Sequence, residues 1–142
     1  MKRIFSTILM FCLLFSFCGS ALAADAEVFS SPTLSRYTAQ LSRGSSSGKI
    51  TVSYRVGASA STTITSIGVS SIKIYKANGT YVTTITGTTS NGLVGRNASS
   101  HSGTYTYSGV SGTSYYAKVT MFATAGGIND SGTVKTNTVT AP

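Results

Sequence analysis

The chain has 142 residues and a formal net charge of +8, with eleven Lys and Arg, three Asp and Glu, one His and two Cys. This length suits one domain rather than two. Three acids and one His leave few groups for acid–base catalysis or metal binding, and two Cys are too few for a disulfide-rich scaffold.

The N-terminus has the three parts of a secretory signal. Met1-Lys2-Arg3 is the basic start, an apolar run extends from Ile4 to Cys18, and Ala21-Leu22-Ala23 is a small-residue cleavage site. The apolar run is shorter than the roughly 20 residues of a membrane span. Phe17 stands where a lipoprotein site needs a small residue. We therefore predict a signal peptide over residues 1–23 and a secreted, extracellular or surface-associated protein without a transmembrane segment.

Cleavage after Ala23 changes the composition of what remains; Ala24-Asp25-Ala26 is a second possible site. Residues 24–142 contain nine basic and three acidic residues, a net charge of +6, and no Cys. They contain ten Val, seven Ile and eight Tyr against three Leu. β-branched and aromatic residues favour strands, so we expect no helix. The high Ser, Thr and Gly content also suits disorder, an interpretation that we restrict to a loose lead-in over residues 24–34.

The predicted domain extends over residues 35–142. In its first half, apolar and polar residues alternate. A strand is expected near Tyr37–Ser42, followed by a turn. In Lys49–Val56 every second residue is apolar, which is typical of a half-buried antiparallel strand. Ile64, Ile67 and Val69 mark either the approach to the next strand or a short strand of their own. Ser71–Lys76 and Tyr81–Thr86 flank Asn78-Gly79, a strong hairpin signal because both residues tolerate positive φ.

The second half begins with a gap in the pattern. Residues 87–103 show no alternation and are predicted to form a long loop, whose role the sequence leaves open. Strands are expected at Thr104–Val110 and Ser114–Thr124. A loop over Ala125–Asp130 precedes a last strand, Gly132–Ala141, in which a bulge would reconcile Val134 with Val139. About seven short strands without a helix predict a single antiparallel β-sandwich.

Residues near the C-terminus resemble the fibronectin type III family. Gly112-Thr113-Ser114-Tyr115 and the following residues to Val119 are similar to its penultimate strand, and Thr138–Pro142 is similar to its end. The resemblance implies a fibronectin type III-like or immunoglobulin-like sandwich. Tyr54 stands where that family usually has Trp, which puts strict membership in doubt. The Tyr75–Gly79 hairpin is also similar to that of small secreted Gram-positive proteins of unassigned function. Neither likeness implies an activity.

The inventory of reactive groups disfavours catalysis. Beyond the signal, the chain offers His101 in the predicted long loop and three acids, Asp25, Glu27 and Asp130. A glycosidase needs two positioned carboxylates, and a zinc site needs three or four clustered ligands. A triad of a Ser with His101 and Asp130 can be drawn, but a solvated loop histidine is the simpler interpretation. We expect no enzyme, no catalytic residue, no metal site and no cofactor.

A binding surface is the remaining candidate. In the fibronectin type III plan the third, sixth and seventh predicted strands are neighbours, which would gather cations and aromatic rings on one outer face. The predicted face consists of Lys73, Tyr75, Tyr81, Tyr116, Lys118, Phe122 and Lys135. It could bind an anionic cell-wall polymer, a glycan or a protein. Alternatively, the same residues only stabilise the sheet. Nucleic acid is disfavoured because the basic residues form no stripe.

Three functions follow in order of preference. The first is a secreted, non-catalytic binding or surface-associated module for an anionic cell-envelope polymer or glycan. The second is a cationic secreted effector that acts on membranes or competing cells, although the amphipathic helix of many such agents is missing. The third is a structural extracellular subunit that self-associates through sheet edges. Ligand identity and oligomeric state are left open by the sequence.

Overall fold

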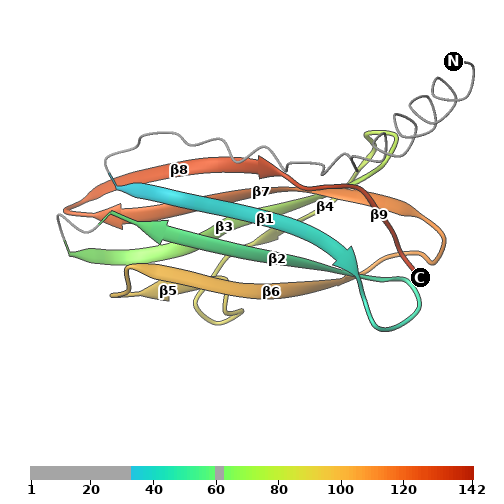
Figure 1. The fold of residues 1–142 in the computed structure, drawn as a ribbon, viewed down its shortest axis with the longest axis horizontal. Coiled ribbons are helices and arrows are strands. Elements are labelled where there is room, and N and C mark those ends of the chain that lie inside the picture. The colour runs from blue at the N-terminus through green and yellow to red at the C-terminus, as the bar shows by residue number, and fades with distance from the viewer. Residues whose placement is uncertain (1–32, 60–62) are drawn as a thin grey trace, which may run out of the picture.

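A computed structural model describes residues 33–59 and 63–142 of the chain. The predicted signal peptide and most of the predicted lead-in lie outside these residues. Within them the chain forms nine β-strands (Figure 1). They are β1 Leu34–Arg43, β2 Lys49–Ala58, β3 Ile64–Lys76, β4 Tyr81–Thr86, β5 Val94–Arg96, β6 Ser100–Ser108, β7 Ser114–Ala125, β8 Ile128–Lys135 and β9 Val139–Thr140.

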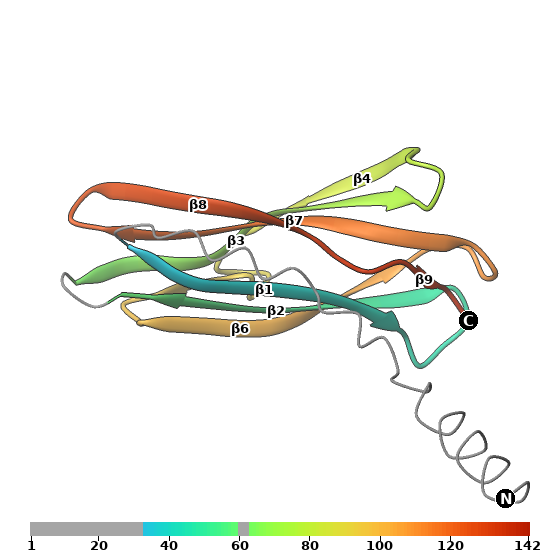
Figure 2. The same cartoon turned by 45° about the horizontal axis from the view of Figure 1, so that its top comes forward.

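The strands form two antiparallel sheets that pack face to face. One sheet has three strands in the order β1-β2-β6; the other has six, with the path β4-β3-β7-β8, β5 on β3 and β9 on β7. Figure 2 shows the two layers, with β1, β2 and β6 below the longer sheet. The all-β sandwich predicted from the sequence is confirmed. No helix in the described part of the chain is long and apolar enough to span a membrane.

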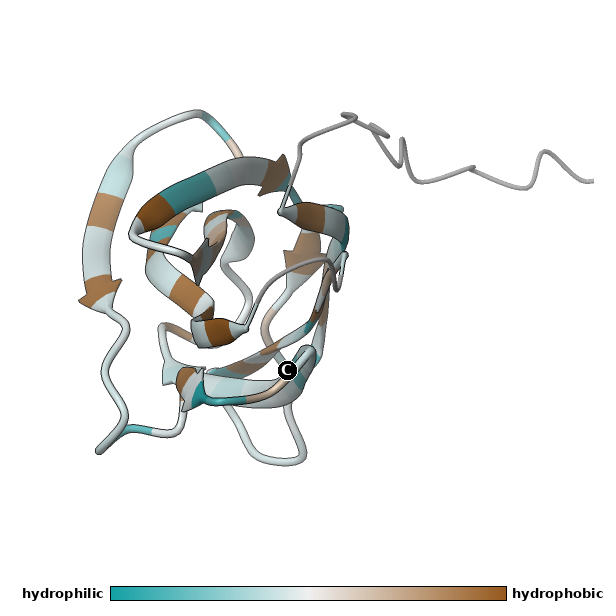
Figure 3. Ribbon diagram, turned by 90° about the vertical axis from the view of Figure 1, so that its left-hand side faces the viewer, coloured by the Kyte–Doolittle hydropathy of each residue, from teal (hydrophilic) through white to brown (hydrophobic). Residues whose placement is uncertain are grey.

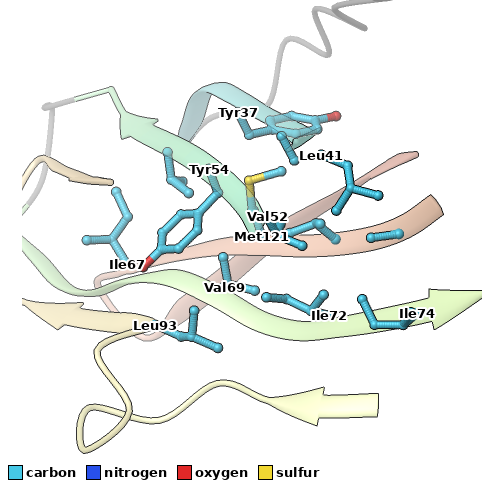
Figure 4. Packing of buried hydrophobic residues seen from close by; sticks show 14 of the residues in the cluster. Tyr37, Leu41, Val52, Tyr54, Ile67, Val69, Ile72, Ile74, Leu93 and Met121 are labelled. Atoms are coloured by element: carbon cyan, nitrogen blue, oxygen red, sulfur yellow. The ribbon is translucent and has the colours of Figure 1, made fainter. Parts of the chain in front are cut away.

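Period-two alternation creates the core between the sheets. Ile50, Val52 and Val56 of β2 are fully buried, and so are Ala117, Val119 and Met121 of β7. Apolar and polar residues alternate along the strands in Figure 3, and Figure 4 shows Tyr54, Ile67, Val69 and Met121 meeting between the layers. Since each fully buried aliphatic side chain contributes about 1.5–3 kcal/mol, this cysteine-free core can hold the domain without disulfides.

Two register shifts explain the irregular spacing of the buried residues in β3. Ile64, Ile67 and Val69 belong to the same thirteen-residue strand as Ile72, and all four are buried. The pairing of β3 with β7 shifts twice: the shift between Ile64 and Ser66 allows Ile67 to face inward, and the shift between Val69 and Ser71 does the same for Ile72. These residues therefore form the first part of the next strand itself, rather than an approach to it or a short strand of their own.

The Asn78-Gly79 hairpin is confirmed, but its turn differs from the expected type. Only Gly79 has a positive φ, 88°, and its N–H donates to the Lys76 carbonyl at 2.9 Å. The Lys76 N–H in turn donates to the Thr80 carbonyl at 2.9 Å. This is a three-residue loop with glycine in the left-handed position rather than a two-residue turn.

The predicted loop over Ala125–Asp130 is wrong for most of its length. Gly126 and Gly127 both have positive φ, 56° and 82°, and form a two-residue turn between paired Ala125 and Ile128. Strand β8 therefore begins at Ile128. The bulge predicted in Gly132–Ala141 is a larger interruption: residues 136–138 leave the sheet, and Val139 rejoins it as β9.

The predicted loop over residues 87–103 is also partly wrong. Val94–Arg96 forms β5 on β3, and β6 begins at Ser100 rather than Thr104. Leu93 is only 1% exposed and anchors the intervening segment in the core. A shorter connection thus replaces the long loop.

Strand β1 begins at the last residue of the predicted lead-in. Leu34 begins β1 and is 1% exposed, although it was placed in the lead-in. Its N–H donates to Asp130 Oδ2 at 3.2 Å, which ties the start of β1 to β8.

Tyr115 makes a specific contact at the start of β7. Its side chain is 1% exposed, and its hydroxyl accepts the Val110 N–H at 2.9 Å, five residues upstream. The hydroxyl therefore fixes the turn between β6 and β7.

Replacing Tyr115 by Phe is expected to lower the free energy of unfolding by about 1–2 kcal/mol, because the Val110 N–H loses its acceptor. Chemical denaturation measures the change. Tyr107→Phe is the matched control, since the Tyr107 ring packs edge-on against Tyr115 at 6.1 Å. An equal loss in both variants would show that the hydroxyl contact contributes nothing.

Candidate anion-binding face

The longer sheet brings the predicted cationic residues into one row. Lys73 of β3 pairs with Lys118 of β7, and Lys118 pairs with Lys135 of β8. All three side chains are exposed, on the side opposite the core. Because adjacent strands lie about 4.8 Å apart, the three lysine positions span about 10 Å across the sheet. We call this set the lysine row.

Three tyrosines form a second row beside the first. Tyr75 pairs with Tyr116 on one side and with Tyr81 on the other. The Tyr75 and Tyr116 rings are stacked, with centroids 5.2 Å apart and planes 8° apart. Tyr81 meets Tyr75 edge-on at 5.8 Å. We call this set the tyrosine row.

The two rows contact each other through cation–π interactions. Lys135 Nζ lies 4.5 Å from the centroid of Tyr116, and Lys118 Nζ lies 5.4 Å from the centroid of Tyr75. The rings therefore position two of the three ammonium groups, at about 0.5–1 kcal/mol per exposed contact. The contacts also occupy ring faces that a sugar would otherwise stack on.

The lysine row faces no carboxylate side chain in the described part of the chain. The single acidic residue there is Asp130, whose Oδ2 accepts the N–H groups of Thr33 and Leu34 at 3.4 and 3.2 Å. Asp130 pairs with buried Ala123, so its side chain is on the inner face of the longer sheet, where it contacts the start of β1. The lysine row is on the outer face of the same sheet. Three adjacent like charges repel one another, so a bound anion would relieve their repulsion.

Six of the seven predicted face residues lie together, and Phe122 lies apart. Phe122 is on the same outer face of β7, but it pairs with Gly68 and Ser131. It is four residues beyond Lys118, or about 13 Å along the strand. Phe122 therefore lies outside the two rows.

Thr84, which the sequence did not single out, extends the lysine row onto β4. Thr84 pairs with Lys73, and its hydroxyl lies 2.9 Å from the Tyr81 hydroxyl. Counting outward from a two-residue Asn78-Gly79 turn already places Thr84 beside Lys73, because the register shift between Tyr75 and Ile74 offsets the extra residue of the actual loop.

His101 is not a solvated loop residue, as the sequence suggested. It lies in β6, half-buried, with Nε2 at 2.9 Å from the Gly92 carbonyl and 3.2 Å from the Tyr54 hydroxyl. Burial raises the pKa of Tyr54 above its ordinary value. His101 and Asp130 thus have separate hydrogen-bond partners. No group of three or more His, Cys, Asp or Glu gathers within residues 33–59 and 63–142.

Comparison with protein-family models, curated proteins and solved structures finds no match to this chain.

Proposed function

We propose that the protein is a secreted, non-catalytic module that binds an anionic polymer of the cell envelope through the lysine row. The observation that carries this proposal is the register Lys73–Lys118–Lys135, which sets three exposed ammonium groups side by side without a facing carboxylate side chain in the described residues. The ligand chemistry is a chain of repeated phosphate or carboxylate groups. Such a chain can contact all three lysines at once.

The aromatic contacts favour an anion over a neutral glycan. Tyr116 has Tyr75 against one ring face and Lys135 Nζ over its ring at 4.5 Å. Sugar binding by aromatic platforms needs free ring faces, whereas only Tyr81, 55% exposed, offers a largely open ring here. What this face presents to solvent is ammonium groups and phenolic hydroxyls, which donate hydrogen bonds to anionic oxygens.

The finer fold assignment and the compartment belong to the same proposal. We infer a fibronectin type III-like plan, supported by the strand order β1-β2-β6 opposite β4-β3-β7-β8 and by the Tyr115 hydroxyl contact to Val110. Sandwiches of this kind commonly carry a Tyr at that corner. Export rests on the signal-like pattern of residues 1–23.

Binding to defined polymers tests the proposal. Residues 24–142 are immobilised and exposed to long-chain polyphosphate, polyglutamate and neutral dextran at 0.1 M and 1 M salt. We expect retention of a polyanion at about 0.1 M salt and its release at about 1 M, where the Debye length falls from about 10 to 3 Å. Preference for phosphate or carboxylate identifies the ligand class. Equal retention of dextran, or salt-insensitive binding, would contradict an electrostatic site.

A further inference from the structure

Strand β6 presents a free edge in the described structure. Within its own sheet it pairs with β2 alone, on the side away from β1 (Figure 1). Gly109 N–H donates to the Gly48 carbonyl, and the Ser99 carbonyl accepts the Ala58 N–H, both at 2.8 Å. The backbone N–H and carbonyl groups of odd-numbered residues in β6 therefore point toward β2. The N–H and carbonyl groups of even-numbered residues, Ser100 to Ser108, point away from it.

Side chains cover part of the other sheet edges. Asn137 bridges the edge of β1: its Oδ1 accepts the Leu41 N–H and its Nδ2 donates to the Leu41 carbonyl, both at 2.9 Å. Asp130 accepts the Leu34 N–H at the other end of the same edge. On β4, Asn91 Nδ2 covers the Thr86 carbonyl at 2.8 Å. In the described residues, the segment before β6 contacts the His101 side chain, with the Gly92 carbonyl 2.9 Å from Nε2, but no side chain hydrogen-bonds to the outward backbone groups of β6.

The composition of β6 also permits its edge to pair with a strand of another chain. Its nine residues are Ser-His-Ser-Gly-Thr-Tyr-Thr-Tyr-Ser, with no Lys, Arg, Asp, Glu or Pro. Charged residues and proline are the usual means by which edge strands resist pairing with another chain. β1, by contrast, carries Arg36 and Arg43.

We propose that β6 pairs with β6 of a second copy of this chain, antiparallel about a twofold axis at Thr104. This register pairs all nine residues, Ser100 with Ser108 of the other copy, and every outward-facing backbone group falls in a hydrogen-bonded position. Thr104 then faces its own counterpart. Tyr105 lies opposite Gly103, so that the aromatic ring covers a residue without a side chain.

The second copy extends the sheet and doubles the binding surface. A twofold axis between antiparallel strands is perpendicular to the sheet, so both longer sheets turn their outer faces to the same side. The two lysine rows would then face one polymer or surface together, and linked sites gain avidity without new contacts. The pairing of the two β6 strands does not depend on a bound polymer, so the experiments below test dimerisation without a polymer.

Cross-linking tests the register directly. In residues 24–142, which lack Cys, Thr104→Cys places two thiols across the axis at a Cα separation of about 5.5 Å, within disulfide range. Gln40→Cys is the matched control, because Gln40 is exposed on the same outer face, two strands away along the same row. Under mild oxidation we expect a covalent dimer for Thr104→Cys at several-fold higher yield than for Gln40→Cys. Equal yields would overturn the proposal.

A second variant tests pairing without covalent chemistry. Thr104→Lys sets two added charges against each other across the axis, whereas Gln40→Lys adds the same charge elsewhere on the face. Sedimentation velocity should show concentration-dependent dimerisation for the unmodified chain and for Gln40→Lys, and at least about tenfold weaker association for Thr104→Lys. Thermal melts of both variants confirm folding. A chain that stays monomeric at all concentrations would overturn the proposal.

Discussion

Replacing Lys73, Lys118 and Lys135 together by Glu is expected to abolish polyanion retention, lowering the affinity by at least about 100-fold. Each lysine beside an anionic surface contributes about 1 kcal/mol, so the loss of three corresponds to about two decades in the dissociation constant. The reversed charges add repulsion to this loss. Titration calorimetry or biosensor binding with polyphosphate and polyglutamate measures the change.

A control with the same change in net charge isolates position from charge. Arg36, Lys49 and Arg55 are exposed on the shorter sheet, away from the lysine row. Their joint replacement by Glu also lowers the net charge by six, yet it should weaken binding less than about tenfold, because charges beyond a Debye length are largely screened. If both triple variants lose binding equally, the chain binds polyanions by its overall charge.

Replacing Gly87 by Ala is expected to cost more than about 4 kcal/mol or to prevent folding. Gly87 follows β4, and its N–H donates to the Ser70 carbonyl at 2.8 Å. An added Cβ would overlap the Val69 carbonyl oxygen, a backbone atom within β3 that cannot move aside. Losses of this size occur where a substitution forces a buried backbone clash. Denaturant unfolding, or the soluble yield if folding fails, gives the result.

Gly92→Ala is the matched control for this prediction. Gly92 has a positive φ of 75°, but no atom lies within 4 Å of an added Cβ. Its replacement should therefore cost only the conformational strain of the left-handed region, about 1–2 kcal/mol. Similar losses at Gly87 and Gly92 would mean that the contact between the end of β4 and β3 is not tight.

Alternation of apolar residues made the central strands predictable. In β2 and β7 the buried residues follow period two without interruption, since both strands lie inside their sheets and cover one side of the core. The same parity placed Lys118 and Tyr116 outward. Knowing that β3, β7 and β8 are neighbours then sufficed to predict the lysine row.

Edge strands and turns were less predictable, for physical reasons. Ser100–Gly103 has no large apolar residue, because the start of β6 is held by backbone pairing with β2 rather than by burial. Gly126-Gly127 suggested a loose loop, but the freedom of glycine here permits a tight turn. Phe122 shares the parity of Lys118 and lies elsewhere, since parity fixes a face and not a distance along it.

The ring contacts were beyond sequence-based prediction. Lys118 over Tyr75 and Lys135 over Tyr116 depend on side-chain rotamers and on the register between neighbouring strands. These contacts are the reason why we propose an anionic ligand rather than a sugar, the two ligand classes that the sequence left open.

Amide chemical-shift mapping tests the central claim most directly. Residues 24–142, labelled with ¹⁵N, are titrated with a short polyphosphate at low salt. We expect shifts that cluster on Lys73, Tyr75, Tyr116, Lys118 and Lys135 and disappear at high salt. Shifts clustered instead around Arg36 and Arg55 on the shorter sheet, or none at any polymer concentration, would contradict the proposed site.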